Sequence, residues 1–251
     1  MIPSPITSHD RTIVSEVGSI DAPVLDVTEV VALEQRIAAS GTSLYELMHR
    51  AGCFLGCEVQ QILEEGTIAP NDSRIVVLCG YGNNGGDGWV AADYLRKAGY
   101  QIDLITPRSA HELTAEPAHT TACELEEVLL DDPSVSLLVD PNRKEVDECL
   151  QRADVIVDAL LGTGFSGDTV REPFASWIKS ANHRKRLGAN IVAADVPSGF
   201  NAQTGNVADP CVKADSTVTM ICLKTGLCVS GSREYCGTIT VAPLADIEPF
   251  L

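Results

Sequence analysis

Seven short, continuous apolar runs separated by polar stretches constrain the fold of this chain more than any other feature. Continuous apolar residues, as opposed to alternating ones, are typical of parallel strands that helices cover on both faces. The pattern therefore predicts an α/β fold, a three-layer α/β/α sandwich with a mostly parallel central sheet. The predicted strands are 75–78, 102–105, 135–139, 155–161, 191–194, 218–223 and 239–241.

Length and composition indicate one main domain. A chain of 251 residues with 45% hydrophobic content can bury a full core without a second domain. Residues 1–24 carry prolines and scattered polar residues with no periodicity, which predicts a flexible N-terminal arm. We therefore expect a single domain over residues 25–251.

An N-terminal helical pair should open this domain. Asp26 and Ser43 each stand three residues before a glutamate, which is the capping-box spacing of a helix start. The second helix carries an apolar stripe at helical spacing, from Leu44 to Ile62. This stripe could pack in the core or form a subunit interface, and the sequence leaves both alternatives open.

Charge and cysteine usage argue against several classes of function. The formal net charge of -17 at pH 7 disfavours binding to nucleic acid or to an anionic membrane surface. The nine cysteines include no C-x-x-C pair, which indicates a reducing compartment and favours buried thiols over a metal cluster. No run approaches the length of a membrane span, so we expect no membrane insertion and a cytoplasmic location.

Residues 79–88 read C-G-Y-G-N-N-G-G-D-G, between a predicted strand and a predicted helix over residues 89–98. Glycines allow positive φ angles and a close approach of the backbone to a ligand, and a helix N-terminus attracts anions. Asp87 and Gly88 stand where a phosphate-transferring loop needs Lys and then Ser or Thr, so phosphoryl transfer is disfavoured. A conventional nicotinamide dehydrogenase is disfavoured too, because the second strand ends without an acidic residue. The structural alternative is a tight turn that needs several positive φ angles.

The predicted strand over residues 155–161 leads into a second glycine-rich turn. Gly162, Gly164 and Gly167 match G-x-G-x-x-G, and such a turn can offer N–H groups to another part of the same ligand. Asp158 stands inside this apolar strand, where an unpaired carboxylate would be costly to bury. It needs a cation, a hydrogen-bond donor or a proton, so its partner is either a neighbouring loop N–H or a bound metal ion.

Asp195 directly follows the predicted strand over residues 191–194, and Pro197 and Gly199 shape the turn after it. A carboxylate at the rim of a water-poor pocket suits proton transfer, and capping of the next turn is its alternative role. Lys224 could reach a phosphate, contact the buried carboxylates or remain in solvent. Parallel strands end at the same edge of a sheet. We therefore expect the turns after residues 155–161 and 191–194 to meet the first glycine-rich segment at one site.

In their order and spacing, these motifs resemble the NAD(P)H-hydrate epimerase family, the YjeF N-terminal domain. The resemblance is carried by G-Y-G-N-N-G-G-D-G at 80–88, V-D-A-L-L-G-T-G-F-S-G at 157–167, A-D-V-P-S-G at 194–199 and T-V-T-M-I-C-L-K-T-G at 217–226. It implies a Rossmann-like sandwich, often a homodimer, that interconverts the R and S epimers of hydrated NADH or NADPH.

The resemblance also implies roles for individual residues. Asp195 would be the acid–base group beside the reacting ring, and no redox cofactor is implied because the damaged nucleotide is itself the substrate. Asn84, Asp158 and Ser198 would hold a potassium ion, for which oxygen ligands are suitable. The residues that would contact the hydrated NADH or NADPH are Asn83, Asn84, Gly85, Gly86, Asp87, Gly162, Thr163, Gly164, Phe165, Ser166, Gly167 and Asp195.

A partner and a rival function follow from the same resemblance. The family's companion is an NAD(P)H-hydrate dehydratase, so a functional pairing with that separate enzyme is implied. Related domains also serve as non-catalytic nucleotide-binding interaction modules, which is the alternative function. The intact Asp158, Asp195 and both glycine-rich segments favour the enzyme. At Asn201 the family usually has an aspartate, so a second carboxylate beside Asp195 is missing from this chain.

Overall fold

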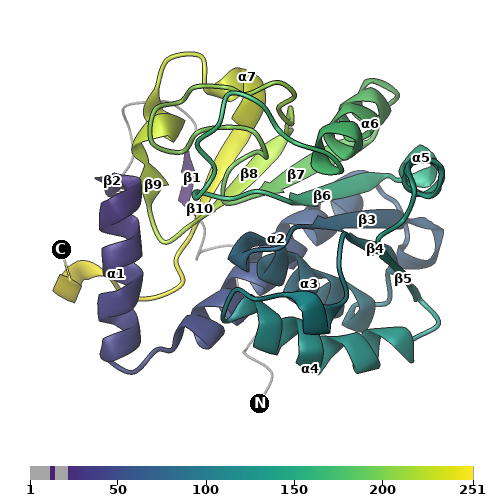
Figure 1. The fold of residues 1–251 in the computed structure, drawn as a ribbon, viewed down its shortest axis with the longest axis horizontal. Coiled ribbons are helices and arrows are strands. Elements are labelled where there is room, and N and C mark those ends of the chain that lie inside the picture. The colour runs from purple at the N-terminus through teal and green to yellow at the C-terminus, as the bar shows by residue number, and fades with distance from the viewer. Residues whose placement is uncertain (1–11, 15–21, 251) are drawn as a thin grey trace.

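The computed structural model describes residues 12–14 and 22–250, which form an eight-stranded sheet with helices on both faces (Figure 1). Neighbouring strands are parallel except at one edge, where the first strand pairs antiparallel with the last. The predicted α/β/α sandwich with a mostly parallel sheet is thus confirmed. The strands are β1 (Thr12–Val14), β2 (Val24–Leu25), β3 (Arg74–Cys79), β4 (Gln101–Thr106), β5 (Val135–Val139), β6 (Val155–Ala159), β7 (Asn190–Ala194), β8 (Ser216–Met220), β9 (Leu223–Lys224) and β10 (Thr238–Ala242). The helices are α1 (Val27–Ala39), α2 (Leu44–Glu65), α3 (Asn83–Lys97), α4 (Ala118–Leu130), α5 (Arg143–Arg152), α6 (Phe174–Arg186) and α7 (Arg233–Cys236), and the short helix η5 (Glu248–Phe250) follows β10.

The order of strands across the large sheet is β1-β10-β8-β7-β6-β3-β4-β5. From β3 the chain builds outward through β4 to β5 and then returns to β6, on the other side of β3. The loops after β3 and β6 therefore leave the sheet in opposite directions. In open α/β sheets such a reversal leaves a crevice at the carboxyl ends of the strands, where ligands bind.

The apolar run over residues 218–223 forms two strands, although its sequence predicts one. β8 ends at Met220, and β9 pairs with β2 in a separate two-stranded sheet. Ile221 lies between them with φ 67°, and the Cys222 N–H donates to the Met220 carbonyl oxygen at 2.7 Å. This tight turn is unusual for a β-branched residue, and it directs Lys224 back toward the edge of the sheet.

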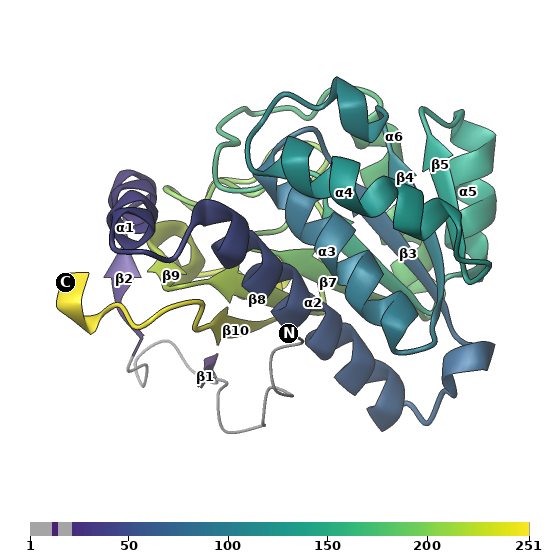
Figure 2. The same ribbon diagram turned by 90° about the horizontal axis from the view of Figure 1, so that it is seen from below.

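Two apolar cores lie on the two faces of the sheet, as the alternation of side chains along a strand requires. Ile75 and Val77 of β3 pack with α2, α3 and α4, whereas Val76 and Leu78 pack with α5 and α6. Figure 2 shows α2, α3 and α4 together over the first face. The central strands are buried on both faces, which explains their continuous apolar sequences.

The predicted N-terminal helical pair is present as α1 and α2. Asp26 caps α1: its carboxylate accepts from the Glu29 N–H at 2.8 Å, and its own N–H donates to the Glu29 carboxylate at 2.9 Å. At the start of α2, the Ser43 hydroxyl oxygen accepts from the Glu46 N–H at 3.1 Å. Both helices therefore begin where their capping residues predict.

The apolar stripe of α2 packs inside this chain. Gly52 lets α3 approach closely, because a Cβ at this position would overlap the Val90 side chain. Gly56 has the same role opposite Tyr94. Core packing therefore accounts for the stripe, whose buried members are Leu47, Met48, Ala51, Leu55 and Val59.

The predicted arm over residues 1–24 lies outside the described residues, except at 12–14 and 22–24. Within the described part, β1 pairs with β10 and β2 begins at Val24. All nine cysteines are free thiols. None of the helices among residues 22–250 has the length and apolar character that a membrane crossing requires.

Candidate active site

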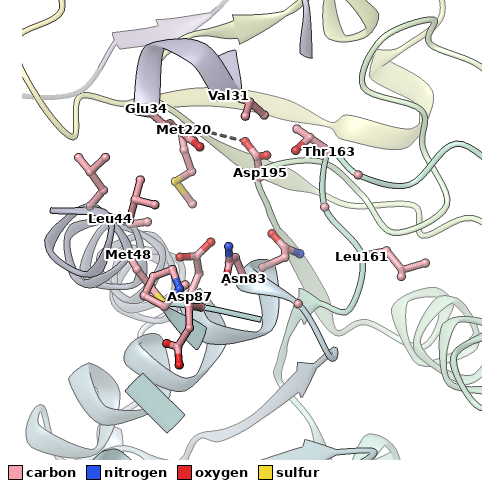
Figure 3. Close-up of a pocket in the computed structure, with 18 of the residues that line it drawn as sticks. Val31, Glu34, Leu44, Met48, Asn83, Asp87, Leu161, Thr163, Asp195 and Met220 are labelled. Atoms are coloured by element: carbon pink, nitrogen blue, oxygen red, sulfur yellow. Dashed lines mark hydrogen bonds between the residues drawn. The ribbon is translucent and has the colours of Figure 1, made fainter. Parts of the chain in front are cut away.

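A cavity of about 590 Å³ lies at the carboxyl ends of β3, β6 and β7, beside α1, α2 and the N-terminus of α3. Asn83 and Asn84 of α3, Thr163 after β6 and Asp195 after β7 all line it. Figure 3 shows Asn83, Thr163 and Asp195 around the same open space. The structure therefore brings the three predicted strand ends together.

The first glycine-rich segment is mostly helix, although the sequence predicts that the helix begins at residue 89. α3 begins at Asn83, and its N-cap residue Gly82 offers no side chain to the first-turn N–H groups. These groups and the positive end of the helix dipole are therefore available to an anion. Within residues 80–88 no glycine has a positive φ, so the alternative of a tight turn with several positive φ angles is wrong.

Close packing explains these glycines. A Cβ at Gly80 would overlap the Leu160 carbonyl oxygen, and one at Gly85 would overlap the Gly80 carbonyl oxygen. A Cβ at Gly86 would lie 2.5 Å from the Met48 sulfur. Gly85 and Gly86 are buried in α3 and are not part of the cavity wall, so their contact with a nucleotide stays a prediction.

Three polar side chains of α3 line the cavity. The Asn83 Oδ1 accepts from the Ala118 N–H at 3.3 Å. The Asn84 Nδ2 is buried and has no hydrogen-bond partner among the described residues. Burial, together with two neighbouring carboxylates, raises the pKa of Asp87 well above its usual range. A protonated Asp87 and the unpartnered Asn84 amide can therefore bond a polar ligand.

The turn after β6 supplies another part of the wall. A Cβ at Gly162 would lie 3.1 Å from the Asn84 side chain, so this turn packs directly against the start of α3. The Phe165 N–H donates to the Gly162 carbonyl oxygen at 3.1 Å, which closes the turn. Of the predicted binding residues here, Gly162, Thr163, Gly164 and Phe165 line the cavity, and Ser166 and Gly167 do not.

Asp158 is 1% exposed and finds its hydrogen-bond donors in neighbouring loops. The Ser198 N–H donates to Oδ2 at 2.7 Å and the Ser198 hydroxyl to Oδ1 at 2.6 Å, while the Leu160 N–H reaches Oδ1 at 3.4 Å. Burial raises the pKa of Asp158 to about 6, although these hydrogen bonds act to lower it. Of the two partners that the sequence leaves open for Asp158, the N–H group of a neighbouring loop is therefore present. Among the described residues, no group of three or more His, Cys, Asp or Glu side chains could hold a metal ion.

Asp195 occupies a strained turn directly after β7. Its φ is 63°, and the Val196 N–H donates to the Ala194 carbonyl oxygen at 2.8 Å. A left-handed conformation is uncommon for residues other than glycine, and strain of this kind clusters at functional positions. The turn directs the carboxyl group into the cavity (Figure 3).

Lys224 is the cation that contacts Asp195, and it is 1% exposed, so a solvated lysine is wrong. Its Nζ donates to Asp195 Oδ1, to Thr219 Oγ1 at 3.0 Å and to the Met220 carbonyl oxygen at 2.8 Å. Asp195 Oδ1 also accepts from the Thr219 hydroxyl and the Met220 N–H, both at 3.1 Å. Within the described chain these bonds all end on Oδ1, which leaves Oδ2 for a ligand.

Glu34 is a cavity residue that sequence reasoning missed. It lies on α1, outside the central sheet, and points into the same cavity as Asp195 (Figure 3). Burial and the negative charge of Asp195 raise the pKa of Glu34 to about 7, and the Lys224 ammonium opposes this shift. The only sequence signal is its place beside Val30, Leu33 and Ile37, the buried apolar residues of α1, and many surface glutamates have such a place.

The cavity wall is acidic. Glu34, Asp87, Glu116 and Asp195 line it, and none of the described residues in the wall is Lys or Arg. A phosphate group bound here would therefore depend on backbone N–H groups and on the dipole of α3.

Comparison with known proteins places the chain in a family. The model of the family described as YjeF-related protein N-terminus matches residues 44–226, which is more than half of the chain. The chain belongs to this family. The matched region contains both glycine-rich segments, Asp195 and Lys224, whereas Glu34 precedes it.

The curated relatives differ in length. One from Cenarchaeum symbiosum, named NAD(P)H-hydrate epimerase, is 32% identical over 86% of this chain and 92% of the relative. A bifunctional NAD(P)H-hydrate repair enzyme from Coxiella burnetii is 35% identical over 88% of this chain and 41% of the relative. Another from Salinibacter ruber is covered over 43% of its length, so the chain spans less than half of both bifunctional relatives.

A solved structure shares the fold. The crystal structure of yeast ynu0 superposes with a TM-score of 0.69 and covers 81% of this chain and 82% of its own. Because the two chains are only 23% identical, this likeness shows a shared fold and nothing more.

Proposed function

We propose that this chain is an NAD(P)H-hydrate epimerase, which interconverts the R and S forms of hydrated NADH and NADPH. One observation carries the proposal. Asp195, bonded through one oxygen to the buried Lys224, faces a cavity that also contains the uncapped N-terminus of α3. A group suited to proton transfer thus lies beside a helix end suited to a nucleotide phosphate. The names of the Cenarchaeum and Coxiella relatives support the same activity.

The reaction requires only that the protein position the substrate and transfer protons. In the hydrated nicotinamide ring, C6 carries a hydroxyl group beside the ring nitrogen. The C–O bond can break when the hydroxyl receives a proton and the nitrogen lone pair forms a C=N bond. Water then returns to the other face of C6, and Asp195 is the acid–base group that we assign to this exchange. Cleavage of the C–N bond to an open aldehyde is the alternative route, and neither route needs a redox cofactor.

We assign the nucleotide to the cavity wall. The first-turn N–H groups of α3, at Asn83 and Asn84, would hold the diphosphate. The turn over residues 162–165 would contact another part of the nucleotide, with Asp195 beside the hydrated ring.

We also propose a potassium ion held by Asn84, Asp158 and Ser198. The residues fit such an ion, because Asp158 is a buried carboxylate and Ser198 bonds both of its oxygens. The Asn84 side chain lies at the adjoining turn, next to Gly162, and its amide oxygen would be the third ligand. A bound cation would offset the charge of Asp158 and join the turn after β6 to the start of α3.

The proposed enzyme would work together with an NAD(P)H-hydrate dehydratase. Its relatives from Coxiella burnetii and Salinibacter ruber are named bifunctional repair enzymes, and this chain matches less than half of each. The homodimer and the cytoplasmic location stay predictions. The free thiols suit a reducing compartment.

The test is the conversion of pure R-hydrate of NADH into the S form, followed by chromatography against the spontaneous rate. Wild-type protein should accelerate the conversion. Asp195→Asn should still bind the nucleotide and lose roughly 10²–10⁴-fold in turnover, while the exposed Asp131→Asn should match wild type. No acceleration by folded wild-type protein would contradict the epimerase and leave a non-catalytic nucleotide-binding module.

A further inference from the structure

Glu34 is a titratable group of the cavity wall that the proposed mechanism leaves unused. It lies on α1, which packs against α2 and η5 and borders the cavity. Val31, Glu34 and Gln35 form the face of α1 that lines the cavity, and their spacing is that of one helix face. The geometry of the helix therefore presents this carboxyl group to the site.

Glu34 and Asp195 have opposite surroundings. Asp195 is bonded to the buried ammonium of Lys224, whereas no cation or hydrogen-bond donor among the described residues contacts the Glu34 carboxyl group. Burial and the charge of Asp195 raise the pKa of Glu34 to about 7, so near neutral pH much of it carries a proton. Two nearby carboxyl groups with such different environments are suited to separate roles as acid and base.

We propose that Glu34 is the proton donor of this site and acts as a pair with Asp195, an inference that rests on the proposed epimerase function. Glu34 gives its proton to the C6 hydroxyl oxygen, which takes the electron pair of the breaking C–O bond and leaves as water. The lone pair of the ring nitrogen forms the C=N bond of the ring cation. Water adds to the other face of C6, and Asp195 accepts the proton that this water releases. Proton exchange with solvent then restores both carboxyl groups, so atoms and charge balance over the cycle.

The charges around Glu34 come from several elements. Asp195 and Lys224 act on it most strongly, and Asp87 lies across the cavity from it (Figure 3). Glu46 and Arg50 of α2 form an ion pair with each other. Glu116 also lines the cavity, and other titratable groups on α1 and near it include Glu29, Arg36, Cys222 and Glu248.

The test is Glu34→Gln, which keeps the size of the side chain and removes the acidic proton. At pH 7 we expect kcat for the R-to-S conversion to fall about 100-fold, with KM changed by less than about threefold. In wild type, kcat should fall as pH rises through about 7, because the donor loses its proton. This alkaline limb should disappear in Glu34→Gln. Glu34→Asp, which keeps a carboxyl group, should restore part of the rate.

The matched control is Glu127→Gln on the exposed face of α4, which makes the same substitution outside the cavity and should keep the wild-type rate and pH profile. Circular dichroism and thermal unfolding should show that all variants are folded. A folded Glu34→Gln with wild-type kcat and an unchanged alkaline limb, or with a change in KM alone, would overturn the role of Glu34 and leave the epimerase standing. Folded wild-type protein without activity would overturn both.

Discussion

Replacement of Lys224 by methionine tests the buried ion pair on which the site is built. Methionine keeps most of the apolar stem, so the change removes mainly the ammonium group. The hydrogen bonds to Asp195, to Thr219 and to the Met220 carbonyl oxygen are lost with it. The Asp195 carboxylate, whose side chain is 13% exposed, is left without its cation.

The expected cost follows from this burial. Removal of one partner from a buried ion pair costs about 3–5 kcal/mol, because the remaining charge is uncompensated. The partial exposure of Asp195 allows water to reach its carboxylate, so we expect the lower end, a loss of about 3 kcal/mol in the free energy of unfolding. For a chain of this size, each 1 kcal/mol lowers the melting temperature by about 2–4 °C, which gives a fall of about 6–12 °C.

Urea unfolding at pH 7, followed by circular dichroism, measures this loss. Lys179→Met, at an exposed position of α6, is the matched control and should change stability by less than about 0.5 kcal/mol. The double variant Asp195→Asn/Lys224→Met should lose less than the sum of the two single losses, because no buried charge then stands alone. Lys224→Met with the stability of the control would refute the proposed stabilisation by the pair.

Three further predictions concern packing, metal binding and pH. Gly80→Ala should lower the free energy of unfolding in urea by about 3 kcal/mol, because its Cβ would overlap the Leu160 carbonyl oxygen. The control Gly164→Ala, whose Cβ would have no atom within 4 Å, should lower it by less than about 0.5 kcal/mol, and equal losses would contradict the packing argument. Potassium chloride should raise the melting temperature of wild type above that in tetramethylammonium chloride, and a difference that persists in Asp158→Asn would contradict the proposed ligands. The pKa of Glu34 rises from 4.5 to about 7 on folding, so wild type should lose stability relative to Glu34→Gln as pH rises from about 4 to 8, by at most about 3 kcal/mol. If thermal unfolding gives parallel pH curves for the two proteins, the raised pKa of Glu34 is contradicted.

The sequence predicted the sheet well because its strands are buried on both faces. The continuous apolar residues of β3 and β6 have no solvent-facing side, so each marks its own strand. The convergence of the strand ends then follows from parallel topology, which brings all carboxyl ends to one edge of the sheet.

The sequence could not predict features that tertiary packing decides. Glycine is a poor helix former, which moved the predicted start of α3 to residue 89, yet α3 begins at Asn83. Tertiary packing requires these glycines, because close contacts leave no room for a side chain at Gly80 or Gly85. Likewise, nothing local marks Ile221 as the left-handed residue that ends β8. The burial of Lys224 follows from that turn.

Glu34 was missed because the cavity that it lines is formed by residues remote from it in sequence. It belongs to a helix outside the sheet and faces a residue that follows β7. Asn201, in contrast, has a local role, since its side-chain oxygen accepts from the Gln203 and Thr204 N–H groups, both at 2.9 Å. An amide oxygen serves this turn as well as a carboxylate would.

The most direct test of the central claim, that three strand ends form one nucleotide site, is a crystal structure of Asp195→Asn with hydrated NADPH. We expect the diphosphate at the N-terminus of α3 and the C6 hydroxyl group of the hydrated ring within hydrogen-bond reach of residue 195 or Glu34. A nucleotide bound elsewhere on the molecule, or one whose hydrated ring lies away from residue 195, would contradict the claim.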